Sequence, residues 1–265
     1  MKMFEAISVL FLLSACAVAA GTVKTEVVKY TVDGIVMHGF LAYPEDIAAP
    51  RPGILVVHEW MGLNAYAKRR AEELAALGYV ALAADMYGEG KTAKDTTEAS
   101  AWAGALKAGD RSAMRLRAAT ALQTLREWKF TDRTKLAAIG YCFGGTTVLE
   151  LARSGADLRG VVSFHGGLDT PKPDETRGVH PAILVCHGAD DPYNPKALVD
   201  AFQDEMRKSG ADWQMVFYGD AVHSFSNPEA GNDKSKGAAY DAKADRRSRA
   251  LMRSFLDELF GEVRR

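Results

Sequence analysis

The chain has 265 residues, of which 48% are hydrophobic and 25% charged, as is typical of a globular protein with a full-sized core. Its formal net charge at pH 7 is −1. The densest basic segment, residues 243–253, alternates with acidic and apolar residues as on a solvated helix face, so we expect no nucleic-acid partner.

The first residues are expected to direct export and to lie outside the folded domain. Residues 1–20 contain an early lysine, a short apolar run and then small residues, as in a signal peptide, and the run is too short to span a membrane. A lipoprotein signal of residues 1–15 is the alternative, because Cys16 ends a Leu-Ser-Ala-Cys lipobox-like stretch and would carry the lipid. A buried N-terminal helix is the third interpretation. We expect an exported protein, periplasmic or secreted, with one mature domain over residues 21–265.

The next segments alternate between predicted strands and helices. Residues 22–44 alternate polar and apolar side chains around Asp33-Gly34, which predicts a hairpin with a tight turn. Short apolar runs predict strands at residues 52–58, 79–85, 135–140, 160–166, 181–188 and 213–218. Helical spacing predicts helices at residues 65–77, 111–128, 146–153, 195–208 and 245–260. This order is typical of an α/β fold, with a mostly parallel sheet and helices on both faces.

Polar residues follow several of the predicted strands. They are Glu59, Asp85, Cys142, Asp191 and His223. In parallel sheets ligands bind at the carboxyl ends of the strands. The sequence therefore predicts a functional site at this edge of the sheet.

Two cysteines, Cys142 and Cys186, fall within the expected domain. They form no disulfide framework. Cys186 lies inside an apolar strand, where cysteine acts as a small hydrophobe. Cys142 lies between glycines at the end of a strand, so it is either an inert packed thiol or a thiol held out toward a substrate.

The segment around Cys142 matches the nucleophile elbow, with cysteine in the place of the commoner serine. Such a strand-to-helix turn is so sharp that a Cβ at Gly140 or Gly144 would collide with neighbouring backbone. A helix N-terminus favours the thiolate, and the amide of Phe143 supplies half of an oxyanion hole. We therefore favour a nucleophilic role for Cys142.

The acid and the base are expected downstream, because hydrolases with this elbow follow the order nucleophile, acid, base. Asp191 lies on a loop after a strand, directly before a turn-forming proline, and we choose it over its neighbour Asp190. His223 follows the last strand and is the candidate base. Asp220 is the rival acid, but it lies only three residues before His223 and is expected to shape that loop.

The other histidines receive structural or supporting roles. His38 and His180 are expected to be structural, whereas His165 and His187 end strands and should line or buttress the pocket. The segment beginning at His58 reads His-Glu-Trp-Met-Gly, which does not match the H-E-x-x-H pattern of zinc proteases. We expect no metal and no other cofactor.

Over residues 25–260 the sequence resembles the dienelactone hydrolase family, in the segments VVHEWMGLN, AADMYGEG, GYCFGG, HGADDP and GDAVHSF. The resemblance implies an α/β-hydrolase fold with a triad of Cys142, Asp191 and His223. It also implies that Glu59 contacts the resting thiol and helps to take its proton. The amide of Trp60 would be the second oxyanion donor.

The sequence departs from this family at the substrate-binding positions. Members that cleave dienelactone carry two arginines that bind the substrate carboxylate, and here Glu89 and Asn227 stand in their places. Neither residue can replace an arginine that binds a carboxylate bidentately. Together with Tyr87 and Phe225, they are the expected substrate contacts, and the polar stretches 88–110 and 226–245 are expected to set specificity.

We therefore predict a cysteine hydrolase that acts on uncharged or differently charged carboxylic esters, lactones or thioesters. A small-molecule substrate and a monomer or small homo-oligomer are expected. A thiol acyltransferase or peptidase on the same fold, and a non-catalytic binding module, are the alternatives.

Overall fold

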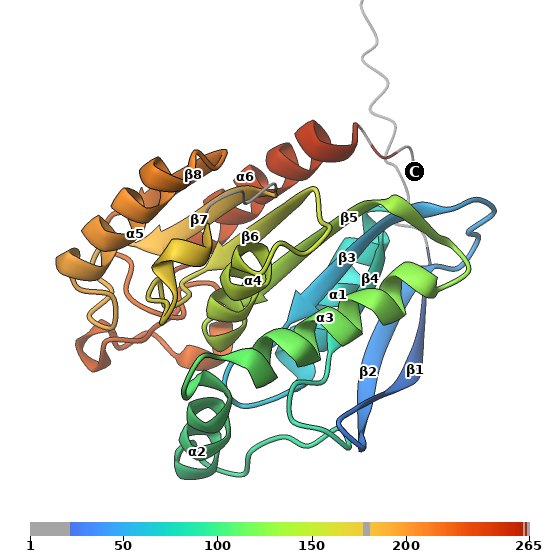
Figure 1. The fold of residues 1–265 in the computed structure, drawn as a ribbon, viewed down its shortest axis with the longest axis horizontal. Coiled ribbons are helices and arrows are strands. Elements are labelled where there is room, and N and C mark those ends of the chain that lie inside the picture. The colour runs from blue at the N-terminus through green and yellow to red at the C-terminus, as the bar shows by residue number, and fades with distance from the viewer. Residues whose placement is uncertain (1–21, 177–180, 262, 264–265) are drawn as a thin grey trace, which may run out of the picture.

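The computed structural model describes residues 22–176, 181–261 and 263. The predicted export signal, Cys16 and His180 lie outside these residues. The described chain forms an eight-stranded sheet with the strand order β1-β2-β4-β3-β5-β6-β7-β8 (Figure 1). The strands are β1 (Val23–Val32), β2 (Ile35–Pro44), β3 (Arg51–Val57), β4 (Val80–Ala84), β5 (Thr131–Tyr141), β6 (Gly160–Phe164), β7 (Ala182–Gly188) and β8 (Trp213–Tyr218).

The strand directions confirm the predicted fold class. β2 pairs antiparallel with β1 and β4, and the pairs from β4 through β8 are all parallel. The β1–β2 hairpin turns at Asp33 and Gly34, whose φ angles of 49° and 79° are both left-handed. This is the backbone of a tight two-residue turn, which suits aspartate followed by glycine.

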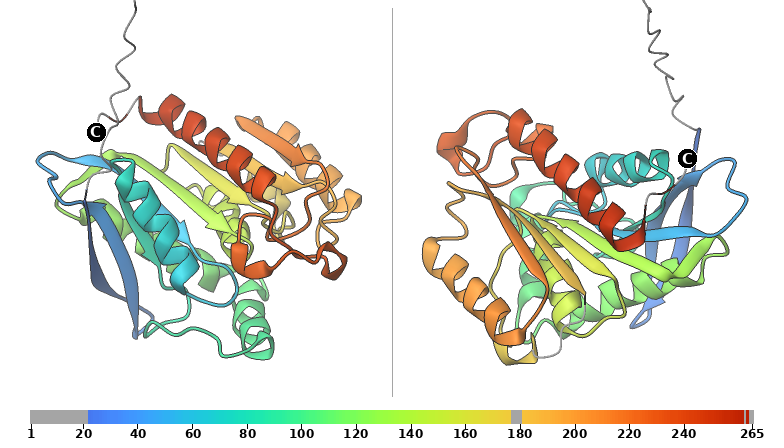
Figure 2. Two further views of the ribbon diagram at one scale, coloured as in Figure 1. Left: turned by 180° about the vertical axis from the view of Figure 1, so that it is seen from behind. Right: turned by 90° about the horizontal axis from the view of Figure 1, so that it is seen from above.

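Helices cover both faces of the sheet. They are α1 (Ala65–Ala76), α2 (Thr96–Lys107), α3 (Ser112–Glu127), α4 (Phe143–Arg153), α5 (Lys196–Ser209) and α6 (Ala242–Phe260). α1 and α6 lie on one face, whereas α3, α4 and α5 lie on the other (Figure 2). None of the helices in the described part of the chain is long and apolar enough to cross a membrane.

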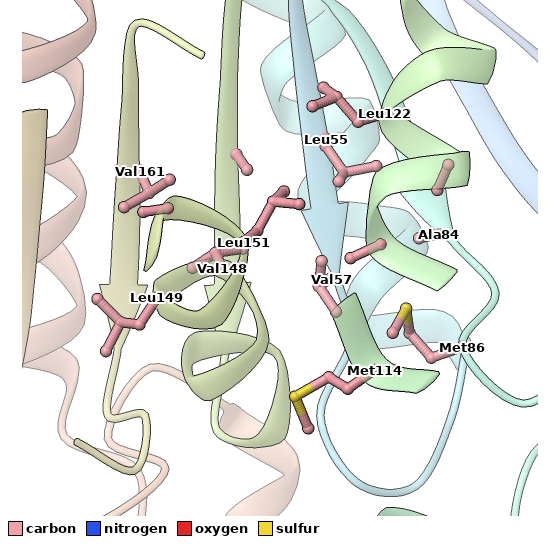
Figure 3. Close-up of a cluster of buried hydrophobic side chains, with 14 of the residues drawn as sticks. Leu55, Val57, Ala84, Met86, Met114, Leu122, Val148, Leu149, Leu151 and Val161 are labelled. Carbon is pink, nitrogen blue, oxygen red and sulfur yellow. The ribbon is translucent and has the colours of Figure 1, made fainter. Parts of the chain in front are cut away.

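The alternation of side chains along the strands builds two cores. Leu55 and Val57 of β3 are buried with Met114 of α3 and Val148 of α4 (Figure 3). Ile54 and Val56 of β3 point the other way, into the core beneath α1 and α6. Burial of both faces explains why the central strands are continuous apolar runs.

Helix α2 is a feature that the predicted elements omit. It lies within the stretch 88–110, which we expected to be a polar connection, and it buries mainly small side chains such as Ala99 and Ala103. A signal for its start is present in the sequence. The Asp95 carboxylate caps the amide of Glu98, and the Glu98 carboxylate accepts from the amide of Lys94, much as in a capping box.

Candidate active site

Cys142 occupies a strained turn between β5 and α4. Its φ and ψ are 53° and −114°, outside the usual regions for a residue with a side chain. A Cβ on Gly140 would stand 1.9 Å from the carbonyl oxygen of Gly144, and one on Gly144 would stand 2.2 Å from that of Val57. The two glycines therefore let the chain turn sharply enough to present the thiol at the carboxyl edge of the sheet.

The structure brings Cys142, His223 and Asp191 together from three separate loops. His223 Nε2 lies 3.1 Å from Cys142 Sγ, and Nδ1 of the same ring lies 2.9 Å from Asp191 Oδ2. Asp191 is buried and also accepts hydrogen bonds from the Tyr193 amide and the Asn194 side chain. The carboxylate thus fixes the imidazole ring with one nitrogen facing the sulfur.

The charges in this group stabilise one another. Burial opposes the charged form of His223, but the Cys142 sulfur and Asp191 together raise the pKa of His223 well above 6.5. Burial likewise opposes ionisation of Asp191, yet the hydrogen bond and charge of His223 bring the pKa of Asp191 below its usual value. This arrangement favours the protonated form of the His223 ring between the sulfur and the Asp191 carboxylate.

The two rival acids lie elsewhere. Asp190 is exposed, and Asp220 forms an exposed ion pair with Lys234. Neither has a hydrogen bond to the imidazole in the described structure. Of the three aspartates considered, Asp191 is the one positioned against His223.

Glu59 lies just after β3 and is hydrogen-bonded to residues other than the thiol. Its buried carboxylate accepts hydrogen bonds from Ser224 Oγ and from the side-chain amide of Asn227. Burial raises the pKa of Glu59, and these two hydrogen bonds together with the charge of His223 oppose that rise. The expected contact between Glu59 and the resting thiol is therefore not the arrangement found, because the sulfur faces the imidazole instead.

A cavity of about 490 Å³ opens above the sulfur. Trp60 and Phe143, the expected oxyanion residues, both line it. Its other lining residues are Ser100, Ala103, Gly104, Lys107, Cys142, Thr146, Gly167, Asp169, Tyr193, Asn194, His223, Ser224 and Ala238. One wall is thus formed by α2, the helix that the predicted elements omit.

The four expected substrate contacts are not among these lining residues. Tyr87 is buried beneath the wall, where its hydroxyl donates to the carbonyl oxygen of Trp60. Phe225 is fully buried in the core, and Asn227 is turned toward Glu59. Glu89 is exposed and pairs with Lys91. These four side chains therefore do not line the cavity, because each is packed in the core or held by another residue, and their role as substrate contacts stays a prediction.

The cavity has an aromatic residue that the sequence analysis did not single out. The Tyr193 ring packs edge-on against the His223 ring at 5.1 Å between centroids, yet it remains largely exposed. Its position two residues after Asp191, on a loop following a strand, is a signal that could have identified it. It forms one side of the entrance beside the imidazole.

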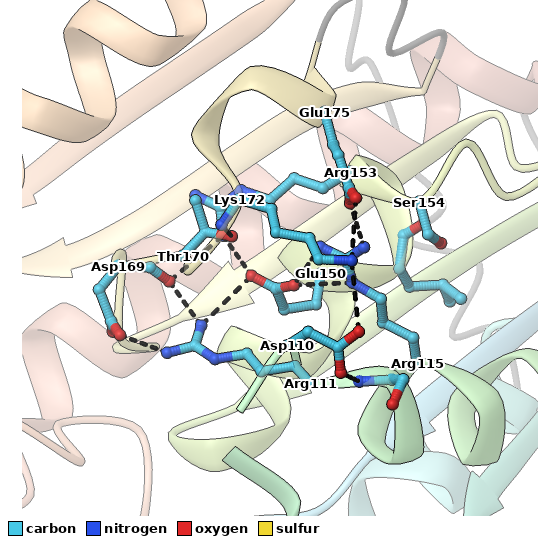
Figure 4. A network of polar contacts seen from close by, with 12 residues as sticks. Asp110, Arg111, Arg115, Glu150, Arg153, Ser154, Asp169, Thr170, Lys172 and Glu175 are labelled. Atoms are coloured by element: carbon cyan, nitrogen blue, oxygen red, sulfur yellow. Dashed lines mark hydrogen bonds and ion pairs between the residues drawn. The ribbon is translucent and has the colours of Figure 1, made fainter. Parts of the chain in front are cut away.

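A buried ionic network supports the wall formed by the loop after β6 (Figure 4). Glu150 of α4 is fully buried and accepts hydrogen bonds from Arg111, Arg115 and Arg153. Arg111 also pairs with Asp169, which lines the cavity. The network ties this wall to α3 and α4.

Two further histidines lie at the strand ends. His165 is fully buried behind the elbow, and His187 is nearly so. Neither lines the cavity, so both are supporting rather than lining residues. Within the described residues there is no group of three or more His, Cys, Asp or Glu side chains that could hold a metal ion.

Comparison with known proteins identifies relatives over most of the chain. The profile of the dienelactone hydrolase family matches residues 37–260. The solved structure titled m3DLH is 43% identical, with a TM-score of 0.87 over 91% of this chain and 100% of that one. A dienelactone hydrolase-like promiscuous phosphotriesterase, P91, from metagenomic libraries is 42% identical, with a TM-score of 0.85 over the same shares.

Curated relatives are more distant or shorter. A putative carboxymethylenebutenolidase of Yersinia pestis is 26% identical over 200 residues, which are 71% of this chain and 73% of that protein. The uncharacterized protein K02A2.1 of Caenorhabditis elegans is 39% identical over 143 residues, which are 53% of this chain and 90% of that protein.

Proposed function

The chain belongs to the dienelactone hydrolase family, and from this premise we propose that it hydrolyses uncharged carboxylic esters or lactones with Cys142 as the nucleophile. The observation that supports this most directly is the position of His223, 3.1 Å from the sulfur and 2.9 Å from Asp191, at the base of a cavity. The cavity has a volume of about 490 Å³ and a largely apolar lining, which suits a small uncharged ester or lactone.

In the acylation step the Cys142 thiolate attacks the acyl carbon. The electron pair of the carbonyl bond moves onto oxygen, where the amides of Trp60 and Phe143 stabilise the charge. As the tetrahedral intermediate collapses, the bond to the leaving oxygen breaks and His223 Nε2 gives its proton to that oxygen. The products are an alcohol and a thioester on Cys142; with a lactone, the alcohol stays attached to the acyl group.

In the deacylation step water replaces the alcohol. His223, now neutral, takes a proton from water as the water oxygen attacks the thioester carbon. Collapse of the second intermediate breaks the bond between carbon and sulfur and restores the thiolate beside the imidazolium. Asp191 holds the ring orientation throughout, because its hydrogen bond to Nδ1 leaves Nε2 directed at the sulfur.

Glu59 is assigned an assisting role in thiol activation. Its carboxylate is close enough to His223 for the two charges to interact, and it is fixed by Ser224 and Asn227. A thiol that rotated away from the imidazole could transfer its proton to this buried carboxylate. Replacing Glu59 by glutamine should therefore slow acylation less than loss of His223 does.

The test is a panel of esters, lactones and thioesters with variants of the triad. Cys142→Ala should abolish esterase activity, and Cys142→Ser should retain little, because a hydroxyl has a far higher pKa than a thiol. His223→Ala should cost a similar factor, and the double variant little more, since such residues act as a unit. Full activity of a correctly folded Cys142→Ala protein would disprove the proposal.

The same panel separates the alternatives. A thiol acyltransferase would release product with an acceptor other than water, and a binding module would turn over nothing. P91, 42% identical, is described as a promiscuous phosphotriesterase, so one phosphotriester belongs in the panel. Its hydrolysis by the wild type and not by Cys142→Ala would assign that activity to the same cavity.

A further inference from the structure

A second histidine lies directly behind the nucleophile. His165 follows β6, is fully buried, and its Nδ1 lies 3.2 Å from the backbone nitrogen of Cys142. The same amide also donates to the carbonyl oxygen of Phe164 at 3.0 Å. His165 does not line the cavity, so it cannot contact the substrate. Its ring instead meets the backbone of the residue that carries the thiol.

The hydrogen bonds define the form of this ring. A backbone amide can only donate, so Nδ1 of His165 must carry no proton and Nε2 must carry one. Nε2 lies 2.8 Å from Ser226 Oγ and donates to it. Burial lowers the pKa of His165 well below its usual value, which agrees with a neutral imidazole.

Ser226 is itself held by two residues of helix α1. Its hydroxyl donates to Tyr66, whose hydroxyl donates in turn to the Ser226 carbonyl oxygen. Arg70 donates to the same carbonyl oxygen and pairs with Asp245 of α6. The donated hydrogens of His165, Ser226 and Tyr66 each have an acceptor, and this orients the Ser226 hydroxyl.

The contact joins two strained residues. Cys142 and His165 have φ angles of 53° and 40°, and neither is glycine. Such conformations are unfavourable for residues with a side chain and persist where surrounding contacts impose them. The close approach of the two loops is visible at Gly145, where a Cβ would stand 2.7 Å from Cα of Gly166.

We propose that His165 is a positioning residue, which accepts a hydrogen bond from the Cys142 amide and so sets the place of the sulfur relative to His223. Ser226 orients the ring for this task. Ser226 lies on the loop that also carries His223. The two hydrogen bonds of His165 therefore hold the backbone of Cys142 in a fixed position relative to this loop, and so relative to the base. This inference rests on the proposed role of Cys142.

Two amide substitutions separate the two hydrogen bonds of the ring. In His165→Asn the side-chain oxygen can replace Nδ1 and accept from Cys142, but the side chain is too short for Ser226. In His165→Gln the longer side chain can replace Nε2 and reach Ser226, but it leaves the Cys142 amide without this acceptor. Both variants carry a side-chain amide, and they differ in whether the backbone amide of Cys142 keeps a side-chain acceptor.

The readouts are kcat and KM for an ester and the rate of alkylation of Cys142 by iodoacetamide. We expect His165→Gln to lower kcat and the alkylation rate by about tenfold to a hundredfold with little change in KM, because small displacements of reacting atoms have such effects. His165→Asn should recover most of both rates. Equal losses in the two variants, or losses that follow the fall in Tm, would overturn the proposal.

A second variant keeps the test decisive if substitution of His165 prevents folding. Ser226→Ala removes the acceptor that orients the ring and should slow alkylation by a smaller factor, about threefold to tenfold. An unchanged alkylation rate in folded Ser226→Ala would count against the proposal. Alkylation requires no substrate, so it tests the position of the sulfur even where the choice of ester is wrong. Activity that survives in Cys142→Ala would instead remove the proposed function itself.

Discussion

The side-chain amide of Asn227 donates a hydrogen bond to the carboxylate of Glu59. Asn227 stands four residues past His223, where dienelactone-cleaving members of the family carry a carboxylate-binding arginine. The other such position holds Glu89, which is exposed and paired with Lys91. At both positions the structure therefore has a group that cannot bind a carboxylate bidentately.

A carboxylated dienelactone should consequently be a poor substrate. Arg111 and Arg115, the nearby guanidinium groups that could compensate, are committed to the buried carboxylate of Glu150. We expect kcat/KM for the carboxylated lactone to be at least about tenfold below that for a neutral ester of similar size. Steady-state kinetics with both compounds measure this ratio. Equal values would mean that another cation of the cavity binds the carboxylate.

The two described cysteines should differ sharply in reactivity. Cys142 is partly exposed in the cavity beside His223, whereas Cys186 is fully buried in β7. Burial also raises the pKa of Cys186 to about 12, which suppresses its thiolate. Brief treatment with iodoacetamide followed by peptide mass analysis should find Cys142 modified first, and a bound substrate analogue should protect it. Faster modification of Cys186 would contradict this.

The predicted fold agrees with the structure because its main signals are local. The Asp33-Gly34 turn and the apolar central strands depend on backbone preference and on burial of both sheet faces, which short segments reveal. α4 begins at Phe143, three residues earlier than its helical spacing indicates, because the elbow passes directly from strand to helix. α2 was omitted because a helix that buries mostly alanine shows a weak apolar stripe.

The site was predictable to the extent that it follows chain order. Cys142, Asp191 and His223 each come after a strand, so parallel topology brings them to one edge. The residues that line the cavity could not be predicted in this way, because they depend on how α2 packs beside the sulfur. The role of His165 was equally hidden, since its partners are a backbone amide and a serine 61 residues away.

The activity should persist through neutral pH and fall on the alkaline side. The proposed reaction needs the His223 imidazolium to protonate the leaving oxygen, and the pKa of His223 is raised well above 6.5. The proton is therefore retained at neutral pH and lost only as the pH rises through this raised pKa. A profile of kcat/KM between about pH 5 and 10 locates the alkaline limb.

The variant Asp191→Asn checks the cause of that limb. It removes the carboxylate that stabilises the imidazolium, so the pKa of His223 should fall and the alkaline limb should move to lower pH. The rate at the optimum should also fall by about a hundredfold or more, because an amide can favour the wrong tautomer of the ring. An unmoved limb would show that another group controls it.

The last prediction concerns the turn that presents the thiol. A Cβ on Gly144 would lie 2.2 Å from the carbonyl oxygen of Val57 and 2.7 Å from that of His58, and both are backbone atoms at the end of the neighbouring strand β3. Backbone cannot move aside as a flexible side chain can. Gly144→Ala should therefore lower the free energy of unfolding by about 3 kcal/mol or more, the upper end for overpacked sites.

Gly219 provides the matched control for this substitution. It lies on the loop that leads to His223, its φ is not left-handed, and a Cβ there would meet nothing within 4 Å. Gly219→Ala should change the free energy of unfolding by no more than about 0.5 kcal/mol. Urea unfolding of both variants gives the comparison. The folded fraction of Gly144→Ala should also show a lower kcat and slower alkylation of Cys142, because relief of the clash must move the elbow away from β3. Wild-type stability and activity in Gly144→Ala would mean that the turn does not have to be this tight for the sulfur to meet His223.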